Sequence, residues 1–275
     1  MRDALRPYAA VLGARFRMLL QYRAAAFAGF TTQLFWGAVR LMILGAFMAA
    51  SPHASPMSLA QIAAYVWLGQ ALLGLLPWNV DPELAEKMTS GAVAYELLRP
   101  LDLYAFWYAR TVALRTATTL LRMLPMVVVA GAVLPLLGLG AWALPPPAGV
   151  DAALLFMVSL LATVALASAV TMLMHVALIW TLSGRGFNTL MTGIVIVLSG
   201  LVVPLPLYPD ALQGLLYWQP FRGLADVPFR IYSGHIGAHA AVFEVLLQFV
   251  WAALIIGSGY ALMAYAKSRV VVQGG

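Results

Sequence analysis

Residues 152–182 read AALLFMVSLLATVALASAVTMLMHVALIWTL, and this run contains no Asp, Glu, Lys or Arg. A helix of about 20 mostly apolar residues crosses the hydrocarbon core of a bilayer, which is roughly 30 Å thick. This stretch therefore predicts a transmembrane helix. Similarly apolar stretches lie at residues 24–49, 59–78, 118–139, 188–203 and 240–266. The sequence thus predicts an all-α, polytopic membrane protein with six transmembrane helices.

The composition of the whole chain supports this class. Apolar residues make up 63% of the 275 residues and charged residues only 9%, whereas soluble domains have about 45–50% and about 25%. Lipid must solvate much of so apolar a chain, and we expect one transmembrane domain over residues 1–275. The net charge of +6 does not indicate nucleic acid as a partner, because the basic residues lie in short segments between the apolar stretches.

The placement of these basic residues predicts the orientation. With both termini in the cytoplasm, the inner segments hold twelve Lys and Arg residues, whereas the outer segments hold only two, Arg222 and Arg230. An excess of Lys and Arg is typical of cytoplasmic loops. We therefore expect cytoplasmic termini, a topology that agrees with an even number of spans.

The chain offers no motif for catalysis or for a metal. It has no cysteine, and its four histidines are scattered without ligand spacing. A phosphate-binding loop needs glycines followed by Lys and Ser/Thr, but Lys87 follows Glu86 and Lys267 follows Ala266. The Gly-x-Ser-Gly nucleophile motif of an intramembrane serine protease is absent too. We expect neither enzyme activity nor a bound cofactor.

Three segments outside the predicted spans have structure of their own. Residues 1–23 place Leu5, Tyr8, Leu12, Phe16 and Leu19 at helical spacing, which favours an amphipathic helix in the membrane interface over an ordinary surface helix.

Residues 79–110 contain the second such segment. Asp81 and Pro82 are typical of a helix start and Gly91 of a helix end, so we predict a short helix at about 82–90. A further turn at 92–98 must stop before Pro100, because the residue before proline avoids the helical region.

Residues 204–239 form the third segment, on the predicted outer side. Three prolines are followed by the apolar run LQGLLYW at 212–218. Because an exposed loop has no reason to be so apolar, we predict a short re-entrant helical hairpin in the outer leaflet.

Several polar residues lie within the predicted spans. Because a charge in hydrocarbon is costly, each of them needs either a function or a partner within the bundle. Arg40 either lines a transport cavity or contacts a partner, or else it snorkels or pairs within the bundle. His175 is expected to be a hydrogen-bonded core residue, with a cavity position as the alternative. We expect Arg122 to snorkel to the inner interface. Glu244 and Gln248 are expected to snorkel to the outer one, with a gate contact as the alternative.

Two motifs resemble a known family. The residues LSG at 198–200, Pro204, LYP at 207–209 and WQPF at 218–221 look like the end of the fifth helix of ABC type-2 exporter permeases. The stretch SGAVAYELLRP at 90–100 resembles the inner loop of the viologen-exporter-like branch of that family.

This resemblance implies a permease of a bacterial inner-membrane ABC exporter. Two permeases, identical or different, would pair in the lipid and dock on two cytoplasmic ATPase subunits, which bind the ATP and magnesium. A coupling role is then expected for Glu83, Glu86, Ser90, Gly91, Tyr95, Glu96, Leu98, Arg99 and Pro100. An outer-gate role is expected for Gly200, Pro204, Pro209, Trp218 and Pro220.

Gly193 and Gly200 are seven residues apart in the predicted fifth span. Small residues on one face let helices approach closely, so we predict that the permeases meet through spans one and five. Two alternatives remain open: a secondary transporter, which would more often carry intramembrane carboxylates, and a structural membrane subunit without ATPase coupling.

Overall fold

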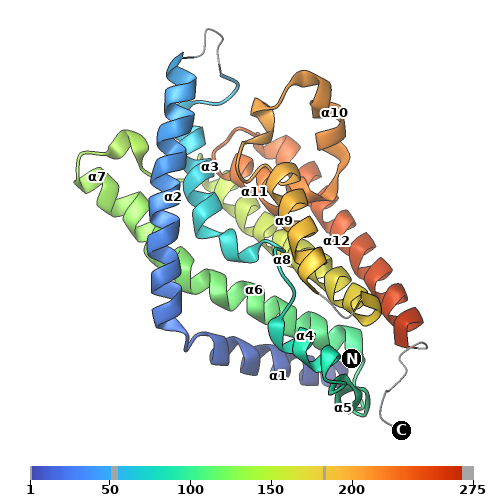
Figure 1. Ribbon diagram of the computed structural model, residues 1–275. Helices are drawn as coiled ribbons and strands as arrows, with labels where there is room; N and C mark the ends of the chain where they lie inside the picture. Colours follow the sequence, from blue (N-terminus) through green and yellow to red (C-terminus); the bar gives the residue numbers. More distant parts are fainter. Residues whose placement is uncertain (1, 51–54, 182–183, 268–275) are drawn as a thin grey trace.

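The computed structural model describes residues 2–50, 55–181 and 184–267, and helices are the only regular elements in these ranges (Figure 1). The α-helices are α1 (Arg2–Leu19), α2 (Arg23–Ala50), α3 (Leu59–Ala71), α4 (Pro82–Thr89), α5 (Val93–Leu97), α6 (Leu103–Val128), α7 (Leu134–Leu136), α8 (Val150–Thr181), α9 (Gly184–Leu198), α10 (Asp210–Trp218), α11 (Asp226–Tyr232) and α12 (Ala238–Lys267). A π-helical turn at Val129–Val133 joins α6 to α7.

Within the described ranges, four helical segments are long and apolar enough to cross a membrane: Arg23–Ala50, Leu103–Leu136, Val150–Ile179 and Ala238–Ala266. They correspond to the predicted first, third, fourth and sixth spans. The other two predicted spans contain shorter helices, since α3 has 13 residues and α9 has 15. The all-helical membrane fold is therefore confirmed, while the count of six spans stays a prediction.

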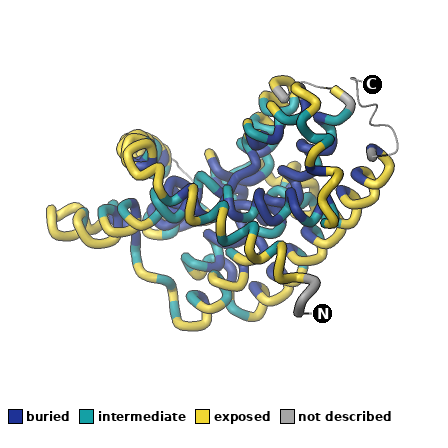
Figure 2. The backbone as a smooth tube through the Cα atoms, turned by 90° about the horizontal axis from the view of Figure 1, so that it is seen from below, coloured by how far each residue is buried: buried dark blue, intermediate teal, exposed yellow. Residues whose placement is uncertain are grey.

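Helix α8 forms the centre of the bundle. Half of its most apolar segment is buried within the chain, against 17–28% for the other three long helices. Small residues such as Ala162, Ala167 and Ala169 are fully buried, so neighbouring helices approach α8 closely. Figure 2 shows buried backbone in the middle and exposed backbone on the peripheral helices. The long apolar side chains of α2, such as Phe35 and Phe47, point outward, as expected for contact with lipid.

The helix of the predicted second span is interrupted. A capping box between Ser58 and Gln61 starts α3, which ends at Ala71 and is followed by a 3-10 turn at Leu73–Leu75 and irregular backbone. Carbonyl groups released by this break need donors, because none is available in hydrocarbon. Arg115 on α6 supplies them: it donates to the carbonyl oxygens of Leu76 and Asn79, both at 2.7 Å.

The short helices of the 79–110 segment form as predicted. The Asp81 carboxylate accepts a hydrogen bond from the Glu83 amide at 3.0 Å and so caps α4. Gly91, with φ of +75°, ends this helix, and α5 follows before Pro100. Helix α1 lies along α6 (Figure 1), and the Tyr8 hydroxyl accepts a hydrogen bond from the Asp102 amide at 3.0 Å.

The 204–239 segment is also helical. Helices α10 and α11 are joined by a 3-10 turn at Pro220–Leu224. Helix α10 is largely exposed, whereas Val227, Phe229 and Ile231 of α11 are buried against the bundle. The position of the 204–239 segment in the outer leaflet stays a prediction.

Two expectations from the sequence were wrong. Gly193 and Gly200 do not share a helical face, because α9 ends at Leu198 and Gly200 lies beyond it with φ of +77°. Glu244 and Gln248 do not snorkel: both side chains are buried and hydrogen-bonded inside the bundle. Helical spacing places a residue along a span, but it does not say whether the residue faces lipid or protein.

Candidate functional site

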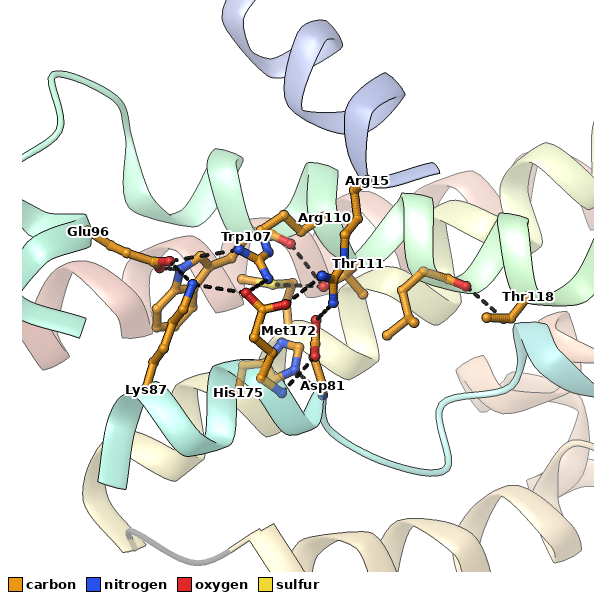
Figure 3. Close-up of polar contacts among 12 residues, drawn as sticks. Arg15, Asp81, Lys87, Glu96, Trp107, Arg110, Thr111, Thr118, Met172 and His175 are labelled. Carbon is orange, nitrogen blue, oxygen red and sulfur yellow. Dashed lines mark hydrogen bonds and ion pairs between the residues drawn. The ribbon is translucent and has the colours of Figure 1, made fainter. Parts of the chain in front are cut away.

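Six charged side chains meet where α1, α4, α5 and α6 come together. We name them the ion-pair cluster: Arg15, Asp81, Glu83, Lys87, Glu96 and Arg110. Figure 3 shows Asp81 directed toward Arg15, and Lys87 and Arg110 directed toward Glu96. Three carboxylates face three cations, so the formal charge of the cluster is zero.

Glu83 is the most connected carboxylate. It pairs with Arg15 of α1, with Lys87 one turn along α4 at 3.1 Å and with Arg110 of α6 at 2.8 Å. Partial burial alone raises its pKa, but the contacts with Arg110 and Lys87, together with the charge of Arg15, lower the pKa to about 2. The net downward shift means that the folded chain stabilises the ionised form of Glu83.

Glu96 connects α5 to α6. Its side chain is buried, one oxygen lies 2.7 Å from the Lys87 ammonium group, and the other accepts a hydrogen bond from the Trp107 indole at 2.6 Å. The family resemblance implied that Glu83 and Glu96 couple the chain to an ATPase partner. The structure instead places both carboxylates in contacts within the chain, so they position α4 and α5.

Asp81 links the cluster to the central helix. Its carboxylate pairs with Arg15 at 3.1 Å, and its backbone amide donates to Nε2 of His175 at 2.8 Å. His175 lies on α8 and is fully buried, which agrees with the expectation of a hydrogen-bonded core histidine. A displacement of α4 would therefore act on α1, α6 and α8 at once.

The opposite face of α5 is apolar and exposed. Tyr95 is 75% exposed and Leu98 is 81% exposed. The guanidinium of Arg99 lies 5.2 Å from the centre of the Phe106 ring. Also exposed, at the edges of this surface, are Glu86, Ser90, Gly91 and Pro100. Exposed large apolar side chains next to rigid charged ones are suited to binding another protein.

The other predicted site residues lie elsewhere. Arg40 donates to the carbonyl oxygen of Leu201 at 2.9 Å, which ties α2 to the turn after α9. A Cβ atom on Gly200 would lie 2.5 Å from the Tyr65 hydroxyl, so this turn packs tightly. Pro204 and Pro209 precede the 3-10 turn at 205–207 and α10, respectively, and Pro220 begins the next 3-10 turn. Trp218 ends α10 and is exposed.

A second buried network anchors the 204–239 segment. Arg222 donates to Glu244 of α12 at 2.8 Å and to the Tyr217 carbonyl at 2.9 Å. The Gly223 carbonyl accepts hydrogen bonds from Gln248 of α12 at 2.8 Å and from Thr163 of α8 at 3.0 Å. The segment is thus fixed to both α8 and α12.

Sequence reasoning counted Arg15 and Arg110 only as loop charges and did not consider Trp107. No local motif identifies them, because Arg15 is 68 residues from Glu83. One signal in the sequence could have indicated the cluster. Residues 81–96 hold four carboxylates, and they lie on the same predicted side of the membrane as most of the basic residues.

Long apolar helices around a buried central helix, with a charged cluster at one end, define a polytopic membrane protein. Among the described residues, no three His, Asp or Glu side chains are grouped to hold a metal ion. Residues 24–269 match the model of the ABC-2 family transporter protein family, so the chain belongs to this family and is a permease component of an ABC transporter. No curated protein shows significant similarity to it.

Proposed function

We propose that this chain is the permease subunit of an ATP-driven exporter in a bacterial cytoplasmic membrane, with both termini in the cytoplasm. It pairs with a second permease, identical or different, and two cytoplasmic ATPase subunits bind the ATP and magnesium. The viologen-exporter-like loop at 90–100 supports the placement within the family, and the excess of inner Lys and Arg supports the orientation.

The ion-pair cluster is the observation that supports coupling through α4 and α5. A coupling element has to transmit a displacement without bending, and α4 and α5 are held to α1 and α6 by paired charges and to α8 by a hydrogen bond. The side chains of Tyr95 and Leu98 are exposed on the surface of this rigid unit, where a partner can contact them. In the proposed cycle, ATP binding draws the ATPases together and moves α4 and α5, and the cluster passes the movement to α6 and α8.

The proposed topology has six crossings. Helix α3 with the irregular stretch after it forms the second, and α9 forms the fifth. The 204–239 segment then lies in the outer leaflet, where the exposed Leu215 and Trp218 of α10 meet lipid.

Replacing Leu98 or Tyr95 with Asp tests the coupling proposal. We expect the chain to insert normally but to lose most co-purification with its ATPase and the substrate-stimulated part of ATP turnover, because a charge replaces an apolar contact. Leu136→Asp is the control, since Leu136 is 86% exposed and lies in α7, on the predicted outer side. Normal transport with the ATPase still bound to the Leu98 and Tyr95 variants would refute the proposal.

One observation favours a secondary transporter as the second candidate. Interrupted helices with released carbonyl groups are common in such proteins, and α3 ends in this way beside Arg115. Transport by the purified chain in vesicles, driven by an ion gradient without any ATPase, would support this alternative.

A further inference from the structure

A hollow of about 440 Å³ opens between the start of α4 and the first turns of α9. It is lined by Asn79, Val80, Pro82, Ala85, Arg185, Asn188 and Thr189. The Val80 amide donates to the Asn188 side-chain oxygen at 3.1 Å and so holds the two walls together. The shape of the hollow is therefore fixed by contacts within the chain. The hollow is separate from the ion-pair cluster and from the exposed face of α5.

Two side chains of the lining offer hydrogen-bond donors to a bound group. Asn188 uses its oxygen to accept from Val80, which leaves its NH2 group for another acceptor. Arg185 is exposed and forms no ion pair with any residue that the structure describes. The described residues of the lining include no carboxylate: Asp81 lies between two of them, but its side chain is buried and paired with Arg15. A positive, donor-rich site favours an anionic group.

An apolar surface continues from the hollow along α9. Leu190 is 59% exposed and Val197 is 48% exposed, and Gly193 between them has open space beside it. These residues follow Gly186 and Thr189 on one face of the helix, at intervals of three and four. A hydrocarbon chain lying in this stripe would cover apolar surface while its headgroup occupied the hollow.

We propose that this hollow binds the headgroup of an anionic amphiphile, and that its chain lies along α9. Arg185 pairs with the headgroup, and the amide groups of Asn79 and Asn188 donate to its oxygens. If the proposed export function holds, on which this step rests, such an anionic amphiphile is the substrate class and enters from the inner leaflet.

Protection of an introduced cysteine tests the binding step. The chain has no cysteine of its own, so Thr189→Cys places one thiol in the hollow. In phosphatidylcholine nanodiscs, we expect dodecyl phosphate to slow modification of this thiol by about 10-fold, since one charge-assisted contact supports an effect of that size. Inorganic phosphate and dodecyltrimethylammonium should protect weakly or not at all.

Matched variants make the result specific. Arg185→Ala should remove the protection and Arg185→Lys should keep part of it, whereas Arg23→Ala removes an exposed cation outside the hollow and should change nothing. Ala14→Cys, on the exposed side of α1, should react equally with and without the amphiphile.

Three outcomes would overturn the inference: no protection by dodecyl phosphate, equal protection by inorganic phosphate, or equal protection by the cationic amphiphile. The second would make the hollow a site for a soluble anion. Because the assay contains neither ATPase nor ATP, its result is independent of the Tyr95 and Leu98 test, and either proposal can fail alone.

Discussion

The 79–110 and 204–239 segments both contain short helices that ion pairs hold against the long ones, but the pairs are built differently. In the ion-pair cluster, Glu83 is 41% exposed and shares three cations with its neighbours. In the 204–239 segment, Arg222 and Glu244 are 5% and 9% exposed, and Glu244 is the only carboxylate that pairs with Arg222 in the described ranges.

This difference bears on which segment can move. A carboxylate with three cationic neighbours can lose one contact and remain paired, so α4 and α5 can shift relative to α1 while Arg110 keeps Glu83 paired to α6. Separation of Arg222 from Glu244 would leave two unpaired charges in a buried site. We infer that the 79–110 segment tolerates displacement, while the 204–239 segment resists it.

The largest expected effect follows from breaking the buried pair. Glu244→Ala leaves Arg222 uncompensated, and such a loss typically costs about 3–5 kcal/mol. The double variant Arg222→Met/Glu244→Leu should be much less destabilised, because no charge remains to be desolvated. Thermal unfolding in mild detergent measures both. If the single and double variants unfold at the same temperature, the pair does not hold the segment.

A smaller effect is expected in the turn that precedes the 204–239 segment. Gly200→Ala places a Cβ atom 2.5 Å from the Tyr65 hydroxyl and 2.9 Å from Cγ of Leu205, at a φ of +77°. Overpacking of this kind costs about 1–3 kcal/mol, to which the backbone strain is added. Gly193→Ala is the control, since it has open space, lies within a helix and should be neutral or slightly stabilising.

Local features of both segments were predictable from the sequence, whereas their tertiary partners were not. Asp81, Pro82 and Gly91 predicted the bounds of α4, because capping depends on residues within one turn. The proline cluster and apolar run likewise predicted a helical 204–239 segment. The direction of Glu244 was mispredicted, since the hydrogen bond from Arg222 depends on how the 3-10 turn at Pro220–Leu224 packs on α12.

The same limit applies to the spans and the site. Continuous apolar runs identified the four long helices. The break after α3 was not predicted, because it depends on Arg115, 39 residues from Leu76, to satisfy the released carbonyl group. Within the cluster, the sequence placed Glu83 and Glu96 in the correct segment but toward a partner, since it could not bring Arg15 and Arg110 beside them.

Gly91 offers a milder test within the 79–110 segment. A Cβ atom at Gly91 would meet nothing within 4 Å, so Gly91→Ala has only the strain of its φ of +75°. We expect a loss of about 1 kcal/mol in stability, clearly less than for Gly200→Ala. Equal losses at the two glycines in the same unfolding assay would show that the two segments are held equally tightly.

The smallest expected effect concerns the pH dependence of the cluster. The pKa of Glu83 falls from 4.5 to about 2 in the folded chain, so its stabilising contribution is complete above pH 4.5 and is lost as the pH falls toward 2. The contribution is modest because Glu83 is partly exposed, and solvent and salt screen its pairs. Glu83→Gln should therefore lower stability slightly at pH 7 and reduce its decline between pH 4.5 and 3. If the wild type and Glu83→Gln lose stability equally over this range, the shared cations do not hold Glu83 in its ionised form, and the proposed mobility of the 79–110 segment loses its physical basis.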